Sequence, residues 1–360
     1  MPDLEAEVDR VCARDLRVDR SLGPLPLLAL SIVLLFSGCG RSGETPTQGA
    51  SPAEETRAPQ RILTLAPSIA EIAFALGLGD RVVGVGDFVL FPPEAAAKPR
   101  LGGLINPNLE AMVRLQPDLA ILLPSESDIG RPLERLGIET LIVPSETLVD
   151  LEAAVLAIGR RCGVEHQAEE LQQDLRALLA PDSIGADRRV MIAVGRPAGP
   201  PAEILVAGPG TFLDELLTRL GAVNVFADAS ALYPQISLEQ VLARSPDLIL
   251  EVHAEEQSTE QIAARQRDWQ EVLSSSGAAD IAVEVISGDW TVIPGPRLPL
   301  LYRAMAQALR TVSVSSTPRN GAKPDAVMPA LIHREEVFFN GDPPSSLRLE
   351  TGESEIGTST

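Results

Sequence analysis

The sequence predicts an α/β protein of two similar lobes, each with a mostly parallel sheet flanked by helices, joined by a helical segment. Three observations predict this fold. A strand–helix–strand pattern opens the folded region, a helix–turn–strand motif occurs once in each half, and the segment between the halves is helical throughout. Strands that alternate with helices form parallel sheets, because each crossover helix packs back onto a face of the sheet.

The first half of the folded region begins with the strand–helix–strand pattern. Residues 62–66 are apolar and predict a strand, and residues 82–85 predict the next one. Between them, Ser68 and Glu71 match the capping-box pattern that starts many helices. Apolar residues at i, i+3, i+4 and i+7 from Ile69 predict one buried helix face. Strand, helix and strand in this order form a right-handed parallel unit.

The helix–turn–strand motif occurs twice, as NPNLEAMVRLQPDLAILL at 106–123 and as QISLEQVLARSPDLILEV at 235–252. Each copy starts with a capping residue, Asn108 or Ser237, whose side-chain oxygen can accept from the free amides of the first turn. The apolar run that ends each copy predicts a strand buried on both faces, as in a parallel sheet.

Two glutamates take the same place in the two copies. Glu110 and Glu239 each follow the leucine that opens the helix, so both lie in the first helical turn. The helix dipole favours a carboxylate there, and the group can stay ionised and exposed. The repetition makes this pair a candidate functional surface; the alternative is two ordinary charges that complement the dipole.

The second half repeats the design of the first. Thr211 and Asp214 predict another capped helix that follows a strand. Between the halves, residues 147–181 show no strand signal and predict helices with a break near Gly163. The other elements of the second half are expected as strands at 190–194, 204–206 and 282–286 and as helices at 259–273 and 298–311.

Residues 1–39 resemble an N-terminal extension followed by a bacterial lipoprotein signal. Two arginines precede an apolar run at 22–36, and small residues lead to Cys39, which would carry the lipid. The run is short and broken by prolines, so we do not expect a membrane span. A plain secretory signal and an uncleaved anchor are the alternatives, and the acidic first 17 residues suggest a translation start downstream, for instance at Val18.

The composition divides the chain into six segments. Residues 40–60 hold Gly, Ser, Thr, Pro and Glu and predict a flexible tether. The expected segments are 1–39 extension and signal, 40–60 tether, 61–146 N-terminal α/β lobe, 147–187 helical backbone, 188–312 C-terminal α/β lobe and 313–360 disordered tail.

The composition also excludes several classes of function. Lys+Arg 30 against Asp+Glu 50 gives a formal net charge of −20, which repels nucleic acid and anionic headgroups. The three cysteines and three histidines show no metal-ligand spacing, so we expect no metal site and no cofactor. The sequence holds no nucleophile elbow, zinc-protease motif or phosphate-binding loop, and we therefore expect no enzyme.

A ligand held between two lobes is the function that this layout favours. Aromatic residues make up only 3% of the chain, so each one on a loop at a strand end carries weight. Trp290 beside Asp289 is the strongest candidate, because a loop tryptophan next to a carboxylate seldom serves packing alone. Phe91 could instead cap the core, and Arg297 could be a surface charge at a helix start. The candidate ligand-binding residues are Phe88, Phe91, Tyr233, Asp289, Trp290 and Arg297.

Five motifs stand in a fixed order between roughly residues 60 and 311: RILTLAPSIAEIAFALG, GVGDFVLFPPEA, NPNLEAMVRLQPDL, YPQISLEQVLARSPDL and SGDWTVIPGPR. In order and spacing they resemble those of a known family, the periplasmic substrate-binding proteins of ABC importers for cobalamin, haem and ferric siderophores. The resemblance is closest to the cobalamin-binding members of that family.

The resemblance implies a rigid helical backbone between two α/β lobes that close only slightly on the ligand. In this family, a glutamate at the tip of each lobe docks onto arginines of a permease dimer, which works with a cytoplasmic ATPase. Glu110 and Glu239 match these two positions. The implied location is the periplasm or cell envelope, with the lipid at Cys39 as the membrane anchor.

The ligand-binding positions match the cobalamin-binding members in part. Phe88 stands where these members have an aromatic residue, Tyr233 where they have a tryptophan, and Asp289 where they have the same residue. The resemblance therefore implies cobalamin as the ligand. Three positions depart from it, with Leu104 and Leu123 in place of tryptophans and Ile293 in place of an arginine.

Haem and ferric siderophores are the alternative ligands. A siderophore would need arginines at the site, for which Arg196 and Arg297 are the candidates, and haem would need Tyr233 as an iron ligand. A lipid-anchored envelope protein without a role in transport is the remaining alternative.

Overall fold

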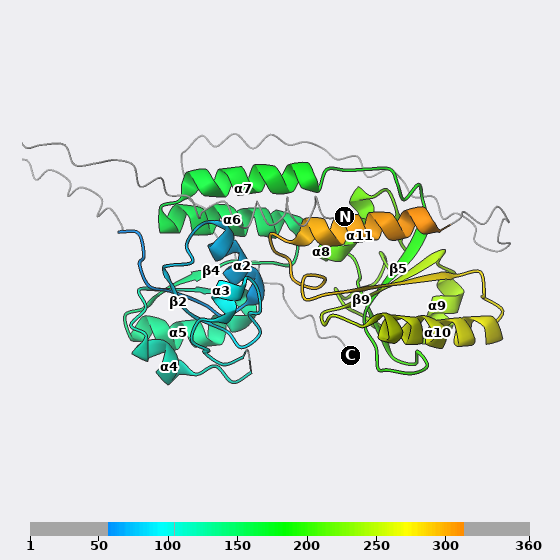
Figure 1. The fold of residues 1–360 in the computed structure, drawn as a ribbon, viewed down its shortest axis with the longest axis horizontal. Coiled ribbons are helices and arrows are strands. Elements are labelled where there is room, and N and C mark those ends of the chain that lie inside the picture. The colour runs from blue at the N-terminus through cyan, green and yellow to red at the C-terminus, as the bar shows by residue number, and fades with distance from the viewer. Residues whose placement is uncertain (1–56, 104, 313–360) are drawn as a thin grey trace, which may run out of the picture. The chain divides into compact units, whose positions relative to one another are not determined.

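The computed structural model describes residues 57–103 and 105–312, which all belong to one compact unit, Met1–Ser315 (Figure 1). Four predictions lie outside the described residues: the signal with Cys39, most of the tether, the position of Leu104, and the tail from 313. No helix within the described ranges is long and apolar enough to cross a membrane.

The N-terminal half, residues 57–146, is built on a four-stranded parallel sheet. The strand order is β2-β1-β3-β4, and β1 and β3 pair in register with Ile62 opposite Leu119. Both central strands are buried along their whole length, as the apolar runs predict. The strands are β1 (Ile62–Thr64), β2 (Val82–Val85), β3 (Leu119–Leu122) and β4 (Glu139–Ile142).

Short helices connect these strands in the expected order. The first of them, α2, begins at Pro67 with Ala66 as its N-cap, and no side chain caps it. The capping box expected from Ser68 and Glu71 is therefore wrong: proline is favoured in the first turn, where its missing N–H costs nothing. The helices are α2 (Pro67–Ala75), α3 (Pro93–Ala96), α4 (Leu109–Arg114), the 3₁₀ turn η1 (Pro124–Glu126) and α5 (Ser127–Arg135).

The C-terminal half, residues 188–312, is built on a six-stranded mixed sheet. Its order is β10-β9-β5-β6-β8, with β7 also paired to β5. The pairs β10–β9, β9–β5 and β5–β7 are parallel, whereas β5–β6 and β6–β8 are antiparallel. Strand β8 was not predicted. The strands are β5 (Arg189–Gly195), β6 (Ile204–Val206), β7 (Val223–Asn224), β8 (Gln235–Ile236), β9 (Leu248–His253) and β10 (Ala282–Ser287).

Two long helices, α6 (Leu148–Cys162) and α7 (Glu165–Leu178), form the predicted helical segment and lie side by side (Figure 1). Gly163 ends α6 in the left-handed conformation, with φ 70°, at the predicted break. An ion pair joins the helices, because Arg176 Nε donates to Glu152 Oε2 at 2.9 Å. The remaining helices are α8 (Phe212–Arg219), α9 (Leu238–Arg244), α10 (Thr259–Ser275) and α11 (Leu298–Thr311).

One hydrophobic cluster connects the two halves. It contains residues of β1 and α2, continues through α6 and α7, and includes residues of β5, β9 and α11. Hydrogen bonds join the helical segment to the C-terminal half: Leu148 N–H at the start of α6 donates to Glu215 on α8 at 2.6 Å, and the Tyr302 hydroxyl on α11 donates to the Ala180 carbonyl at 2.6 Å. The two sheets are therefore tied through shared apolar packing as well as through the chain.

Candidate functional site

The two repeated glutamates lie at equivalent places, each as the second residue of a short capped helix. In α4 the Asn108 side chain accepts from Ala111 N–H at 2.9 Å. In α9 Ser237 is the N-cap and its backbone N–H donates to Gln240 Oε1 at 2.9 Å, while its side chain accepts no cap hydrogen bond. Glu110 and Glu239 are both exposed. The predicted side-chain cap is thus confirmed for Asn108, whereas Ser237 is the N-cap without a side-chain cap hydrogen bond. Each half presents one carboxylate in the first turn of a helix.

The surroundings of the two carboxylates differ slightly. Glu110 pairs with Arg114 one turn along α4 at 2.7 Å, a contact between two exposed side chains that contributes little to stability. A hydrogen bond from the Ser237 side chain lowers the pKa of Glu239 below its usual value. Both groups can accept hydrogen bonds from a guanidinium of another protein, Glu110 after release of Arg114.

Asp289, Trp290 and Arg297 lie on the loop that joins β10 to α11. Arg297 donates from Nη1 to Asp289 Oδ1 at 2.8 Å and from Nη2 to Oδ2 at 3.2 Å, a two-pronged ion pair. About a third of the Asp289 side chain is exposed, against 6% for Arg297. Asp289 can therefore reach a ligand, while Arg297 is neither the surface charge considered above nor a free cation.

The guanidinium of Arg297 has two further partners, both from the N-terminal half. Its Nη2 donates to Glu71 Oε1 on α2, and its plane lies 4.1 Å from the centre of the Phe91 ring. Burial raises the pKa of Glu71 to about 7 against the opposing effect of Arg297. Its other carboxylate oxygen is buried without a hydrogen bond among the described residues.

Trp290 is half-buried and packs against the main hydrophobic cluster. Its side chain therefore contributes to packing, and its exposed part can also contact a ligand. The indole lies over Gly288, where a Cβ would come within 2.4 Å of Trp290 Nε1. Gly288 also has φ 146°, which side-chain-bearing residues rarely adopt. The loop holding Asp289 and Trp290 therefore needs a glycine at this position.

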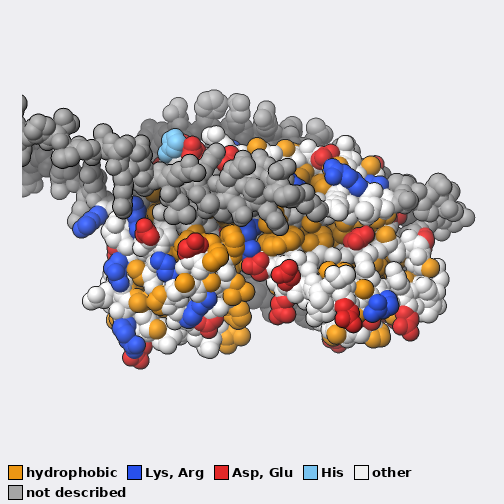
Figure 2. All heavy atoms as spheres, viewed as in Figure 1, with side chains coloured by type: hydrophobic (Ala, Val, Ile, Leu, Met, Phe, Trp, Pro, Cys, Tyr) orange, Lys and Arg blue, Asp and Glu red, His pale blue; other side chains and the backbone are white. Residues whose placement is uncertain are grey.

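Phe88 lies on the loop after β2 and is 71% exposed. A Cβ on Gly103 would lie 3.2 Å from the Phe88 ring, so the ring packs over that glycine. Two neighbouring large apolar residues, Leu90 and Ile105, are also exposed. Figure 2 shows hydrophobic side chains gathered on the N-terminal half, at the left of the view. Exposed apolar groups of this kind mark a binding surface.

Tyr233 is partly buried and precedes β8. Its loop lies close against the turn after β6, where Gly208 N–H donates to the Leu232 carbonyl at 2.7 Å. A Cβ on Gly208 would lie 2.4 Å from the Ala231 carbonyl oxygen, so this approach requires glycine. Burial, helped by Glu146, raises the pKa of Tyr233 to about 12.

The structure thus brings together some of the predicted ligand residues. Asp289 and Arg297 are in contact, Trp290 is next to them in the chain, and the loop of Phe88 reaches Arg297 through Phe91. Glu71 is part of this cluster and was missed, because its partner lies 226 residues away in sequence.

A second buried carboxylate, Glu251 on β9, was also missed. Its oxygens accept from Arg196 Nε at 2.9 Å, Arg265 Nη1 at 2.9 Å and the Trp269 indole N–H at 2.5 Å, and contact His253 Nε2 at 2.7 Å. Burial opposes ionisation, but these hydrogen bonds outweigh it and lower the pKa of Glu251 to about 2. Arg196 is engaged in this network, and its side chain is fully buried.

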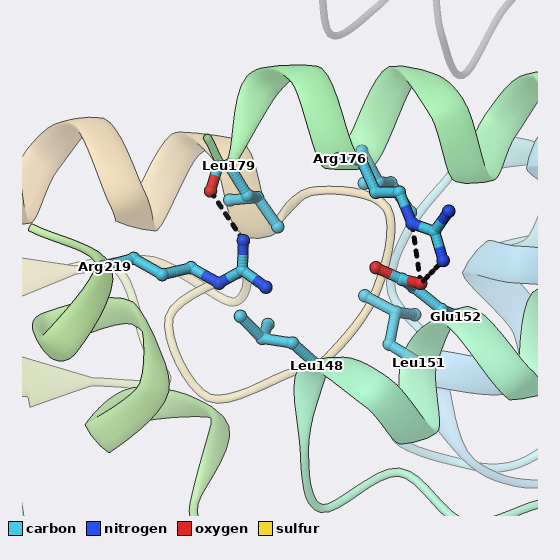
Figure 3. A pocket seen from close by; sticks show the side chains of 7 residues that line it. Leu148, Leu151, Glu152, Arg176, Leu179 and Arg219 are labelled. Carbon is cyan, nitrogen blue, oxygen red and sulfur yellow. Dashed lines mark hydrogen bonds and ion pairs between the residues drawn. The ribbon is translucent and has the colours of Figure 1, made fainter. Parts of the chain in front are cut away.

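Two cavities in the described part of the chain are too small for a large ligand. One of about 10 Å³ lies where α6, α7 and α8 meet, room for one water at most. Figure 3 shows its polar walls engaged, with Arg176 on Glu152 and Arg219 on the Leu179 carbonyl. The other, of about 130 Å³, is lined by Leu65, Gly103, Pro107, Ser125, Glu126, Asp128 and Ile129. Neither reaches the roughly 300 Å³ at which drug-sized ligand pockets begin.

The described residues include no group of three or more His, Cys, Asp or Glu that could hold a metal ion. The titratable residues of the site are instead paired with arginines, as in Asp289–Arg297 and Glu251–Arg196. This arrangement can bind and orient a ligand through aromatic faces and a carboxylate.

Comparison with known proteins identifies the group to which this fold and site belong. The chain is 30% identical to the vitamin B12-binding protein of Pectobacterium carotovorum over 268 residues, which covers 72% of this chain and 91% of the relative. The crystal structure of the periplasmic vitamin B12 binding protein BtuF of Vibrio cholerae matches with a TM-score of 0.56 at 28% identity, over 71% of this chain and 98% of that one.

A periplasmic heme binding protein from Pseudomonas aeruginosa matches with a TM-score of 0.59 at 25% identity, over 71% of this chain and 94% of that one. Residues 62–282 match the family model described as periplasmic binding protein, a range that includes the first sheet, helices α6 and α7, and the second sheet up to the first residue of β10. The chain therefore belongs to the periplasmic binding protein family.

Proposed function

We propose that this protein is the substrate-binding component of an ABC importer, which captures a corrinoid, cobalamin, and delivers it to a membrane permease. The observation that carries the proposal is the 30% identity to a vitamin B12-binding protein over 91% of that relative's length. The relatives and solved structures named above are binding proteins, and the proposed role of this chain is likewise binding.

The state of the two candidate arginines favours a corrinoid over a ferric siderophore. An anionic siderophore requires cations that are free to face it. Arg196 is buried in its pair with Glu251, and Arg297 is buried between Asp289 and Glu71. Each arginine is thus neutralised within the protein. A corrinoid carries neutral amide groups around its ring and does not need these cations.

The environment of Tyr233 favours a corrinoid over haem. A tyrosine that ligates ferric iron binds as the phenolate. Burial raises the pKa of Tyr233 to about 12, which makes the phenolate costly to form. The exposed part of Asp289 suits amide N–H donors, and the exposed Phe88 ring can lie against the face of a large flat ligand.

We further propose that Glu110 and Glu239 dock onto arginines of a permease dimer whose partner is a cytoplasmic ATPase. The structure supports this with exposure at matched places in the two halves. We propose a location in the periplasm or cell envelope with a lipid on Cys39. Mass spectrometry of the mature N-terminus tests that anchor, and peptides from residues 1–17 in the mature protein would refute the downstream start.

A titration of the purified protein against cyanocobalamin, hemin and a ferric siderophore tests the ligand. Calorimetry provides the affinity. Tryptophan fluorescence shows where the ligand binds, because the two tryptophans lie in different places. Trp290 lies on the proposed ligand loop, whereas Trp269 is fully buried beside Glu251. We expect cyanocobalamin to bind and quench Trp290, so Trp290→Phe should lose most of the quenching.

Each other outcome of the titration has a defined meaning. Preference for hemin or for the ferric siderophore would replace cobalamin with that ligand and keep the transport role. Binding of none of the three would refute the transport proposal and favour the envelope lipoprotein without a transport role. Genes for a permease and an ATPase next to this one would argue for transport.

A further inference from the structure

Arg297 contacts groups from both halves of the molecule. Asp289 belongs to its own loop in the C-terminal half, while Glu71 on α2 and Phe91 after β2 belong to the N-terminal half. The side chain of Arg297 is 6% exposed and that of Glu71 is 2% exposed. One arginine, two carboxyl groups and one ring thus meet from segments that are far apart in sequence, with Arg297 and Glu71 buried and Asp289 partly exposed.

The two loops that meet at Arg297 also carry the proposed ligand residues. Phe91 is three residues after Phe88, and Asp289 holds two of the hydrogen bonds of Arg297. Any shift of one loop against the other would lengthen the contact to Glu71 or uncover the Phe91 ring. Both changes cost free energy, because buried charges separated from their partners are strongly disfavoured.

We infer that Arg297 is a positioning residue: together with Glu71 and Phe91 it holds the Phe88 loop and the Asp289 loop at a fixed spacing. The predicted effect of Arg297 on ligand binding rests on the proposed function. In this role Arg297 positions the two loops, in place of the direct contact with the ligand that the sequence led us to expect. We call Arg297, Glu71, Asp289 and Phe91 the arginine latch.

The hydrogen-bond pattern explains why arginine fits this position. Its planar guanidinium offers donors on two edges and a flat face, so it can engage two carboxylates and stack on a ring at once. Lysine would keep the charge but would lose the two-pronged bond to Asp289 and the stacking on Phe91. The latch requires an acceptor at position 71 more than a charge there, since a neutral oxygen also accepts from Nη2.

Amide hydrogen exchange of the ligand-free full chain tests the latch. Both loops hold reporter amides: Asp87 N–H donates to the Gly102 carbonyl at 3.1 Å, and Gly288 N–H donates to the His253 carbonyl at 3.0 Å. We expect Arg297→Met and Glu71→Leu to speed exchange in residues 86–91 and in residues 288–297. Glu71→Gln keeps an acceptor oxygen and should leave both segments close to native.

A matched control removes a similar arginine within one half. Arg244 pairs with Asp228 at 2.8 Å and lies 5.4 Å from the Phe226 ring, all in the C-terminal half. Arg244→Met should leave exchange in residues 86–91 unchanged. If Arg297→Met fails to fold, Arg297→Lys and Glu71→Leu carry the test. Native exchange in residues 86–91 of folded Arg297 variants would overturn the latch.

A titration with cyanocobalamin measures the consequence for ligand. Loss of the latch should weaken binding by about tenfold, within the usual range of coupling between sites, while Glu71→Gln binds as the native protein does. Unchanged affinity in Arg297→Met would overturn the effect on ligand. Absence of cyanocobalamin binding by the native protein would refute the proposed ligand but not the latch, which the exchange experiment tests without ligand.

Discussion

Substitution of Glu71 by glutamine should change how the stability of this protein depends on pH. Glu71 is 3% exposed, and burial raises the pKa of its carboxyl from 4.5 to about 7. The charged groups that act on it are Arg297, which favours ionisation, and Asp289, which opposes it. Arg297 does not compensate fully because it is shared with Asp289 and because Glu71 Oε2 has no donor among the described residues.

The sign of the effect follows from the raised pKa. The folded protein holds a proton on Glu71 that the unfolded chain releases, so this group's contribution to stability is intact below about pH 4.5 and is lost as the pH rises through about 7. From these two pKa values, the free energy of unfolding should fall by about 2.5 kcal/mol between about pH 5 and about pH 8 on account of Glu71. Glutamine does not titrate and should remove this loss.

Urea unfolding of both proteins at the two pH values measures the effect. The quantity of interest is the difference between native and Glu71→Gln, because other groups with raised pKa values, such as Glu126, are common to both proteins. The native protein should lose about 2.5 kcal/mol more than the variant. Parallel losses in the two proteins would refute the reasoning and show that Arg297 compensates the buried carboxylate.

Three other variants, one of them a double substitution, test the proposed docking surface and the fold. Charge reversal at both Glu110 and Glu239 should abolish stimulation of the transporter's ATPase at unchanged ligand affinity, and unchanged transport would refute docking. Trp269→Phe removes one donor from the buried Glu251 carboxylate and should cost about 1–3 kcal/mol in urea unfolding. Gly86→Ala would place a Cβ 2.0 Å from the Leu65 carbonyl oxygen and should cost about 2 kcal/mol or more; an unchanged midpoint would contradict the contact. Two other first-turn glutamates serve as charge-reversal controls for docking, Glu165 and Glu260.

Local signals in the sequence predicted most of the elements. Strand β2 and strand β6 have the predicted bounds, and α11 begins and ends where the apolar spacing places it. These elements depend on alternation, helical spacing and caps, which act over a few residues. The failures are also local in origin: β8 is only two residues long, which is too short for a periodic signal.

The site was predicted less well because its contacts are not local. The sequence marked Asp289 and Arg297 as polar groups on a loop, but nothing in it states that Glu71 completes the cluster. A signal did exist for Glu251, which interrupts the apolar run of a strand predicted to be buried on both faces. A carboxylate in such a strand needs a partner. That argument would have removed Arg196 from the arginines considered for a siderophore.

The ion-pair partners of Arg196 and Arg297 bear on which ligand the site can bind. Arg196 and Arg297 each neutralise a buried carboxylate, Glu251 in the C-terminal sheet and Glu71 where the two halves meet. Freeing Arg196 for an anionic ligand would leave the Glu251 carboxylate uncompensated in the interior, at a cost of several kcal/mol. Freeing Arg297 would separate it from Asp289 and raise the pKa of Glu71 further, so that Glu71 would hold a proton. Binding of a ligand that needs both cations would therefore destabilise the fold, whereas binding of a neutral ligand with amide groups would not. The same pairs that hold the site together thus argue for the corrinoid.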